Sequence, residues 1–442
     1  MRRILPIIAL FSLCGATAQE YIPSYGLERP RSEIRIYPTA EEAAAAGRGA
    51  DRYCTPLTEW SREGNTFSTH FTVPFAWINR QVLFRLERAS CDYEIRVNGR
   101  TAAYNADGNA PAEVDLTKLA KEGRNTLEVV LSEPAAAAVL ESWKEHPAPE
   151  IGQAWVMSQP TLRIRDIRSR TRIGEDGDAT AEVAVVVKTG SLNPRTSRLH
   201  YTLLSPSGET VTTGTRSVTL GMRGEDTVRF LARIPYDSLW NDARATQYRL
   251  LLKTQHEGRY VEYIDRPIGF RSIAMQEDGT MEINGRSVTL RTRKVPGNLT
   301  PEQVADLRRT GCNTIRLLPG PVSEQMLTAC DTCGMYVIAQ TPVDTRRSGD
   351  SRRVGGNPSN NPAWRDAYIE RAENCYYTLQ GHPSVVAFSL ATCSANGINL
   401  YESYLRMKKL PEQRPFIYPE AAGEWNLSLI HISEPTRLDV IS

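Results

Sequence analysis

The sequence has almost no excess charge and contains no dense run of basic residues. Its 442 residues include 53 Lys and Arg and 51 Asp and Glu, which gives a formal net charge of +2. Nucleic-acid binding requires a concentrated positive field, so we expect no nucleic-acid partner. The sequence also has no glycine-rich phosphate loop, no nucleophile elbow and no cluster of metal ligands. We therefore expect neither a metal nor a cofactor.

Long apolar runs are missing beyond the amino terminus. There, two arginines precede an apolar run over 4–13, and a small-residue segment ending at Ala18 follows. This order is typical of a secretory signal peptide over 1–18. Cys14 raises the alternative of a lipoprotein signal, although such signals need a small residue before the cysteine and Leu13 stands there. We expect an exported protein, periplasmic or extracellular, without a membrane span.

Cysteine is sparse, and an odd number of cysteines follows the predicted signal peptide. The seven are Cys54, Cys91, Cys312, Cys330, Cys333, Cys375 and Cys393. Complete pairing within one chain is therefore excluded, while export leaves a bridge between Cys54 and Cys91 open. Most of the others lie in apolar stripes, where a free cysteine packs as a small hydrophobe. Cys330 and Cys333 have a CxxC spacing, but no second cysteine pair accompanies them, which favours helix packing over a zinc or redox site.

Length and composition indicate a soluble protein of several domains. Hydrophobic residues make up 40% and charged residues 24% of the chain, as in globular proteins, and the length suggests about three domains. Short apolar strands alternate with turn residues over 66–131, where Asn98-Gly99 predicts a hairpin turn. A second strand-rich block covers 160–271. We predict a β-sandwich over 19–158 and an immunoglobulin-like β-sandwich over 159–272.

After residue 272 the sequence pattern predicts strands and helices in alternation. Thr300 and Gln303 form a capping-box pattern, Gly311 and Gly334 follow two predicted helices, and Asn361 precedes a third. Apolar strands lie between these helices, which predicts a parallel sheet covered by helices. We count five strands from Val288 to Tyr418 and place this unit at 273–426.

The sequence of residues 427–442 indicates an origin outside the gene. The segment 427–437 looks like the translation of a transposase adapter used to prepare sequencing libraries. We therefore expect a truncated gene in which 427–442 carries no biological information. The alternative is a natural amphipathic tail.

Short motifs occur in all three predicted domains. The first domain carries the segments 71–77, 97–99, 114–117 and 122–127, and the junction to the third carries 269–271, 283–286 and 288–291. The third domain carries 307–316 and 330–338. In this order the motifs resemble glycoside hydrolase family 2, which contains β-galactosidases, β-glucuronidases and β-mannosidases, and the last two resemble the second and third barrel strands of the family. The resemblance implies a jelly-roll sugar-binding domain, an immunoglobulin-like domain and the first part of a TIM barrel. It also implies a glycan or β-glycoside as partner.

The resemblance also places the catalytic acid/base, and this chain departs from the family there. Retaining glycosidases need two carboxylates, one as proton donor and one as nucleophile. In the family, a pattern close to Trp-Ser-Leu-Gly-Asn-Glu supplies the acid/base glutamate after a His-Pro-Ser motif. Here His382-Pro383-Ser384 is present, but Thr392 replaces the asparagine and Cys393 replaces the glutamate. A thiol with a pKa near 8.5 is a poor proton donor to a glycosidic oxygen.

Other active-site positions carried over from the family differ as well. The third strand ends at Gln340 where the family has an acidic residue. After the second strand, Pro319 stands where the family has a substrate-pocket histidine. Arg316 matches a family arginine that lies near the nucleophile, and the alternative is a salt bridge at the barrel mouth. The nucleophile itself would follow a seventh strand. We predict that Cys393 stands at the catalytic acid/base position and that Arg316 and Thr392 bind substrate.

Three hypotheses are compatible with these residues. The first is a family member that keeps its fold and glycan binding but is catalytically impaired, a pseudoenzyme. The second is an active retaining exo-β-glycosidase with a non-standard acid, supplied by Cys393 or by the substrate. The third is a non-catalytic structural β-sandwich module. Loss of several polar groups at the strand ends, where a barrel keeps its chemistry, favours the first.

Overall fold

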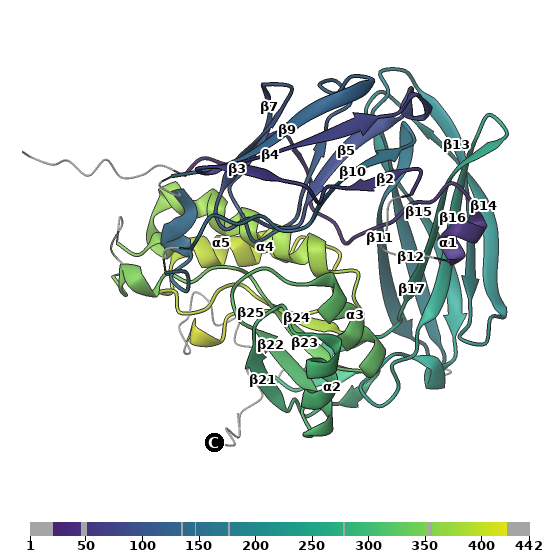
Figure 1. The fold of residues 1–442 in the computed structure, drawn as a ribbon. Helices are drawn as coiled ribbons and strands as arrows, with labels where there is room; N and C mark the ends of the chain where they lie inside the picture. Colours follow the sequence, from purple (N-terminus) through teal and green to yellow (C-terminus); the bar gives the residue numbers. More distant parts are fainter. Residues whose placement is uncertain are drawn as a thin grey trace, which may run out of the picture.

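A computed structural model describes residues 21–45, 51–133, 136–145, 147–175, 177–276, 279–351, 353 and 356–421. The predicted signal peptide at 1–18 and the segment 427–442 lie outside the described residues. Figure 1 shows three parts: two β-sandwiches and a smaller unit of parallel strands and helices, against which both sandwiches pack. A short helix, α1 (Ala40–Ala44), lies in the amino-terminal segment that runs along the second sandwich.

The first sandwich consists of two five-stranded antiparallel sheets. In one the order is β1 (Leu27–Glu28), β8 (Ala112–Asp115), β5 (Gln81–Leu86), β10 (Ala154–Gln159) and β2 (Cys54–Pro56). In the other it is β3 (Ser61–Glu63), β4 (Thr66–Val73), β9 (Gly123–Leu131), β6 (Tyr93–Val97) and β7 (Arg100–Asn105). Phe84 and Ile95 are fully buried in the core between them. Asn98 and Gly99 have φ angles of 51° and 74°, which confirms the predicted hairpin turn.

The second sandwich contains a three-stranded and a four-stranded antiparallel sheet. The three-stranded sheet has the order β11 (Leu162–Ile173), β12 (Ala179–Thr189) and β15 (Glu225–Ile234). The four-stranded sheet has the order β14 (Thr210–Leu220), β13 (Arg195–Leu204), β16 (Tyr248–His256) and β17 (Arg259–Ile268). Tyr201 and Phe230 come from different sheets and stack at a centroid distance of 4.0 Å. The alternating pattern of the sequence therefore forms the predicted two-layer core.

A small antiparallel sheet leads into the third part, which is parallel. The small sheet contains β18 (Ile273–Met275), β19 (Met281–Ile283) and β20 (Arg286–Ser287). The parallel sheet has the order β21 (Thr292–Val295), β22 (Thr314–Leu317), β23 (Tyr336–Gln340), β24 (Val385–Ser389) and β25 (Phe416–Ile417). Its helices are α2 (Pro301–Arg309), α3 (Glu324–Cys333), α4 (Arg365–Leu379) and α5 (Ile398–Met407).

The helix boundaries follow the predicted signals. Thr300 accepts from Gln303 N and the Gln303 side chain accepts from Thr300 N, so the capping box is complete. Helix α3 ends at Gly334, whose φ of 75° suits a residue without Cβ. Asn361 accepts from Ala363 N and starts a short 3₁₀ turn that continues into α4. The first two predictions are confirmed. The third is confirmed only in part, since Asn361 caps the 3₁₀ turn while α4 itself begins at Arg365 after Trp364.

Two predicted barrel strands differ from the structure. The first begins at Thr292 and not at Val288, because the Val288 N–H donates to Met281 O at 3.0 Å and completes the preceding hairpin. The fifth was expected over 414–418 but contains only Phe416 and Ile417. Pro415 has no backbone N–H to donate to a ladder, so paired residues begin at Phe416.

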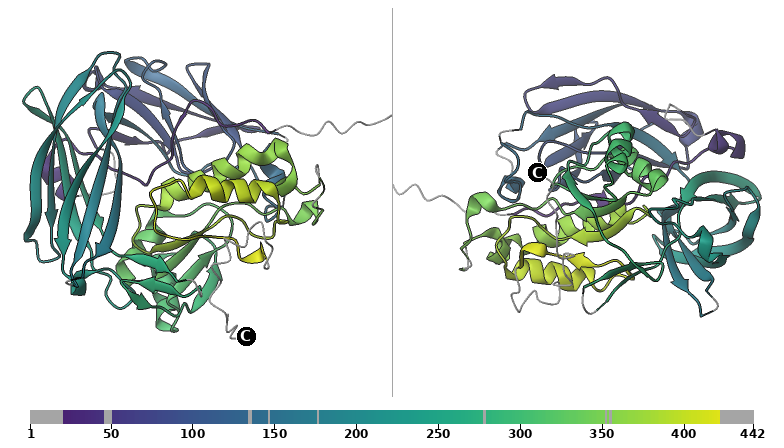
Figure 2. Two further views of the ribbon diagram at one scale, coloured as in Figure 1. Left: turned by 180° about the vertical axis from the view of Figure 1, so that it is seen from behind. Right: turned by 90° about the horizontal axis from the view of Figure 1, so that it is seen from below.

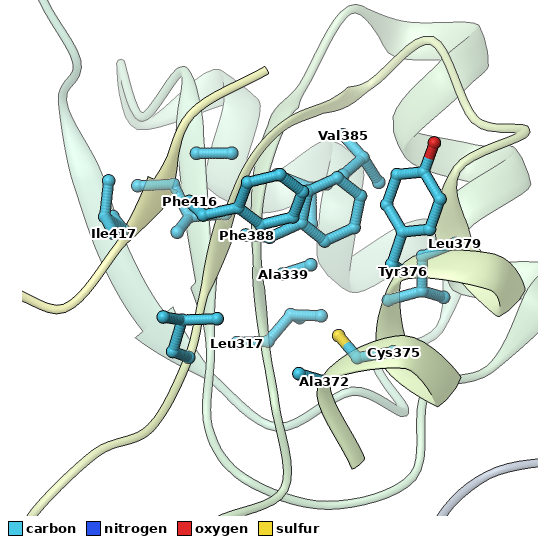
Figure 3. Packing of buried hydrophobic residues seen from close by; sticks show 14 of the residues in the cluster. Leu317, Ala339, Ala372, Cys375, Tyr376, Leu379, Val385, Phe388, Phe416 and Ile417 are labelled. Carbon is cyan, nitrogen blue, oxygen red and sulfur yellow. The ribbon is translucent and has the colours of Figure 1, made fainter. Parts of the chain in front are cut away.

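The core of the parallel unit lies between the sheet and α4. Phe388 and Phe416 stack at a centroid distance of 5.6 Å, and Tyr376 lies 5.3 Å from Phe388 (Figure 3). The apolar positions predicted for the helix are all buried, namely Trp364, Tyr368, Ala372, Cys375 and Leu379. Helices α4 and α5 lie between the parallel sheet and the first sandwich in both Figure 1 and Figure 2. This helix layer connects the two parts.

The cysteines are free wherever the structure describes them. Cys54 and Cys91 are unbridged, which answers the question left open by the sequence. Cys312, Cys330 and Cys375 are buried as small hydrophobes, and burial raises the pKa of the Cys330 thiol well above its usual value. Within the described ranges there is no group of three or more His, Cys, Asp or Glu residues arranged to hold a metal ion. No described helix is long and apolar enough to cross a membrane.

Candidate active site at the carboxyl ends of the parallel strands

The segments that follow β23 and β24 lie side by side with residues 136–145 of the first sandwich, called the arm below. Asp344, after β23, forms parallel bridges with Glu141 on one side and Thr392 on the other. Ser142 N donates to Asp344 O at 2.9 Å, and Thr392 N donates to Val343 O at 3.0 Å. The mouth of the parallel sheet is therefore built by the third part and by the sandwich together.

The arm is fixed to the helix layer by a buried ion pair. Glu141 Oε1 lies 2.8 Å from Arg371 Nη2 of α4, and Glu141 Oε2 lies 2.6 Å from Lys144 Nζ. Burial opposes ionisation of Glu141, but Lys144 and Arg371 outweigh it and lower the pKa of this carboxyl group. Arg371 also donates to Pro342 O at 2.5 Å. One guanidinium thus ties the arm to the segment after β23.

Cys393 lies at the mouth, exposed to solvent, in a strained backbone conformation. Its φ of 47° is in the left-handed region, which costs a residue with a Cβ roughly 1–2 kcal/mol. The next residue, Ser394, is buried, with its Oγ 2.8 Å from Thr345 Oγ1 and 3.1 Å from the Tyr368 hydroxyl. The Ser394 carbonyl also accepts from the Tyr418 hydroxyl. These contacts fix the loop and leave the Cys393 thiol facing outward.

A carboxylate that the sequence analysis missed lies against this loop. Glu420 follows β25, and its Oε2 accepts from Cys393 N at 2.6 Å while its Oε1 accepts from the Thr392 hydroxyl at 2.9 Å. Both oxygens of the Glu420 carboxylate are therefore engaged by donors of the loop after β24. Thr392, the predicted substrate-binding candidate, donates its hydroxyl to Glu420, and its role toward a substrate stays a prediction. The one available signal was the position of Glu420 after a predicted strand, where side chains reach the mouth of a barrel.

A second ion pair lies beside these residues. Asp344 is fully buried, and its Oδ2 is 2.6 Å from Nη2 of Arg346. The bond to Asp344 is the main cause of the raised pKa of Arg346, and the charges of Cys393 and Glu420 add to it. Arg346 therefore lies close enough to Cys393 and Glu420 for electrostatic interactions with both residues.

Arg316 lies deeper than the loop after β24. Its backbone pairs with Ile338 of β23, which in turn pairs with Ala387 of β24, six residues before Cys393. The side chain is buried, with 6% of the residue exposed. The structure thus brings Thr392 and Cys393 together with Glu420 and places Arg316 below them, two strands away. Gln340, at the end of β23, is also buried, and its amide donates to Thr341 O at 3.0 Å.

The histidine of the His-Pro-Ser motif lies at the opposite end of β24. His382 Nδ1 is 2.7 Å from Asp331 Oδ2, and its Nε2 is 3.2 Å from Glu324 Oε2. Burial disfavours the charged imidazole, but the two carboxylates outweigh it and raise the pKa of His382 to about 10. The same interactions, opposed by burial, lower the pKa of Glu324 to about 2. His382 therefore joins β24 to α3 and takes no part in the mouth.

Two β-sandwiches packed on parallel β/α units, with polar groups gathered where the strands end, define a multidomain protein built around a barrel-type site. Three family models match the chain in this order: the sugar binding domain of glycosyl hydrolases family 2 at 56–158, the family 2 model at 162–271, and the family 2 TIM barrel domain at 282–439. The chain belongs to glycoside hydrolase family 2. The predicted fold class is thereby confirmed, while the predicted origin of 427–442 stays a prediction.

Relatives of known sequence or structure agree with this assignment. A β-galactosidase of Priestia megaterium is 22% identical over 422 residues, which cover 89% of this chain and 40% of the relative. A crystal structure of Bacteroides uniformis β-glucuronidase superposes with a TM-score of 0.66 at 17% identity, over 83% of this chain and 48% of that chain. A family 2 member from Bacteroides cellulosilyticus DSM 14838 gives 0.65 at 17% identity, over 80% and 49%. The chain thus spans less than half the length of these three relatives.

Proposed function

We propose that this chain is a glycan-binding member of its family in which hydrolysis by the usual acid/base route is impaired. The observation that carries the proposal is the exposed thiol of Cys393 at the position of the acid/base glutamate. We further propose that its partner is a β-glycoside and that the protein is exported, since residues 1–18 have the pattern of a signal peptide.

The chemistry of the mouth supports impairment. A general acid must hold a proton near neutral pH and release it to the leaving oxygen, which typically contributes about 10²- to 10⁴-fold to the rate. A thiol is weakly suited to this task, and both carboxylate oxygens of Glu420 are engaged as hydrogen-bond acceptors by the loop that carries Cys393. The proton donor that the usual route needs is therefore missing at position 393.

A kinetic comparison of the full-length protein with two variants tests the proposal. We expect hydrolysis of aryl β-galactosides, β-glucuronides and β-mannosides far below a typical turnover of about 10 per second. Cys393→Glu should raise the rate for substrates with poor leaving groups by at least about tenfold if a nucleophile is present, and less for good leaving groups. Cys393→Ser is the matched control and should change neither class. Wild-type turnover near 10 per second would refute impairment.

The alternative is an active retaining exo-β-glycosidase with a non-standard acid. It is favoured by the presence of Glu420, a carboxylate within hydrogen-bond distance of the acid/base position. If Glu420 were that acid, Glu420→Gln would remove the alkaline limb of the pH profile and lower the rate about 10²-fold or more. Our proposal predicts a slow wild-type reaction without such a limb.

A further inference from the structure

We propose that Glu420 is the sugar-binding carboxylate of this mouth and that it selects neutral over acidic glycosides. The inference rests on the proposed glycan binding and adds the residue and the substrate class. No family motif pointed to Glu420, because it follows β25 and not β24.

The geometry places Glu420 beside Cys393, which the family resemblance assigns to the acid/base position. Its carboxylate is one hydrogen bond, 2.6 Å, from the backbone nitrogen of Cys393. A glutamate at 393 would project from the same loop, so a carboxylate still lies beside the place where the family carries one. The loss of one acid is accompanied by a second that reaches the loop from the neighbouring strand.

Glu420 is preorganised as a hydrogen-bond acceptor. An ionised carboxylate has about four lone-pair sites, and the Cys393 amide and the Thr392 hydroxyl occupy two. Glu420 is exposed, so the remaining sites can accept from hydroxyl groups of a sugar. Tyr418, two residues earlier, is buried and bonded to the Ser394 carbonyl. The turn that carries Glu420 is thus anchored to the same loop, and little conformational freedom is lost on binding.

The charges around Glu420 suggest its selectivity. The neighbouring cation, Arg346, is paired with the buried carboxylate of Asp344 through three contacts of 2.6, 2.9 and 3.0 Å. A ligand at the mouth therefore meets an exposed negative charge beside a pair that is already neutral. Hydroxyl groups gain a charge-assisted hydrogen bond there, whereas the carboxylate of a uronic acid is repelled.

Two pairs of methyl glycosides test the inference by calorimetric titration: the β-glucoside with the β-glucuronide, and the β-galactoside with the β-galacturonide. The members of each pair share a ring and differ only at C6, which carries a hydroxymethyl group in the neutral member and a carboxylate in the acidic one. We expect the wild-type chain to bind the neutral member of at least one pair about fivefold or more tightly, a ratio typical of an exposed charge pair. In Glu420→Gln, affinity for that sugar should fall about tenfold and the ratio should approach one. Glu420→Asp keeps the charge with a shorter side chain and should lose affinity while keeping the ratio.

The Cys393 thiol gives a second readout that needs no sugar. Among the described cysteines, Cys393 is the exposed one, so iodoacetamide should modify it first, and Cys393→Ser identifies its signal. Glu420→Gln should change the rate of alkylation, because the Glu420 side chain lies against the backbone of Cys393. A bound neutral sugar should protect Cys393 in the wild type.

The possible outcomes separate the two proposals. If the wild type binds a neutral sugar but Glu420→Gln binds it equally well, the role of Glu420 is refuted and glycan binding stands. If the wild type binds no member of either pair, both fail. A wild type that prefers the acidic member refutes the selectivity. Unchanged alkylation in Glu420→Gln refutes the contact between Glu420 and Cys393, and circular dichroism of each variant identifies misfolding, against which Glu420→Asp remains the second test.

Discussion

Replacing His382 with Gln should make the stability of the protein depend differently on pH. The buried imidazole of His382 joins Asp331 and Glu324 of α3 to the start of β24. Glutamine can keep one hydrogen bond but cannot carry the positive charge. Both carboxylates would then lack the charged imidazole as a partner. The Asp331 side chain is only 10% exposed, so water can replace little of this interaction. The variant therefore tests whether this motif residue has a structural and electrostatic role.

The raised pKa gives an upper limit for the effect. His382 has a pKa of about 10 against roughly 6.5 for an unperturbed histidine, and one pKa unit corresponds to about 1.4 kcal/mol, so the limit is about 5 kcal/mol. Because the Glu324 side chain is 30% exposed and screened by water, we expect about 2–3 kcal/mol. A folded pKa above the unfolded value means that this stabilisation is complete below pH about 6.5 and is lost as the pH rises through about 10.

Glu324 has the opposite sign. Its folded pKa of about 2 lies below its unfolded value, so its contribution is complete above pH about 4.5 and is lost as the pH falls. The free energy of unfolding of the wild type should therefore exceed that of His382→Gln most between pH about 4.5 and 6.5. The difference between the two proteins should shrink towards pH 10. Thermal unfolding of both proteins from pH 4 to 10 measures it.

A control separates this contact from histidine in general. His200 lies on β13 of the second sandwich with its Nδ1 2.9 Å from the Thr215 hydroxyl, so His200→Gln should give no comparable pH-dependent difference. A destabilisation by His382→Gln that stays the same from pH 5 to 10 would show that the wild-type imidazole is uncharged and would refute the reasoning.

Two further substitutions test the supports of the mouth. Glu141→Gln leaves the buried Arg371 without its 2.8 Å carboxylate partner and should destabilise the protein by about 3–5 kcal/mol in denaturant unfolding; a loss below about 1 kcal/mol would show that the arm is not held by this pair. Gly334→Ala should cost at least about 1–2 kcal/mol in the same assay, because its φ is 75° and a Cβ would lie 2.6 Å from Asp242 O. A neutral result there would contradict the close packing of α3 on the second sandwich.

Local signals in the sequence were sufficient for much of the fold. The Asn98-Gly99 turn, the Thr300 capping box and the end of α3 at Gly334 each depend on residues within a few positions of one another. Such features need no knowledge of tertiary contacts. The first barrel strand was misplaced because Val288 has a strand-like neighbourhood but pairs with Met281 instead.

The candidate site was predicted only in part, since its geometry is tertiary. Cys393 and Thr392 were found through the motif that precedes them. Glu420 lies 27 residues after Cys393, and no periodicity or spacing relates the two. Strand order and the parallel register alone bring β25 beside β24, so the contact could not be read before the sheet was known. The contact between the Thr392 hydroxyl and Glu420 could not be read for the same reason.

On the proposed function, the replacement of one carboxylate by a thiol separates binding from catalysis at this mouth. Two carboxylates that lie close together share a proton, because like charges raise the pKa of one of them, and the protonated member can act as an acid. Glu420 instead accepts from the Cys393 amide and the Thr392 hydroxyl. Our proposal therefore gives Glu420 the role of an acceptor for sugar hydroxyls, and it leaves the glycosidic oxygen without a carboxylic acid as its proton donor. In Cys393→Glu, the introduced carboxyl group would lie beside the charge of Glu420. That charge would raise the pKa of the introduced group, as a general acid requires.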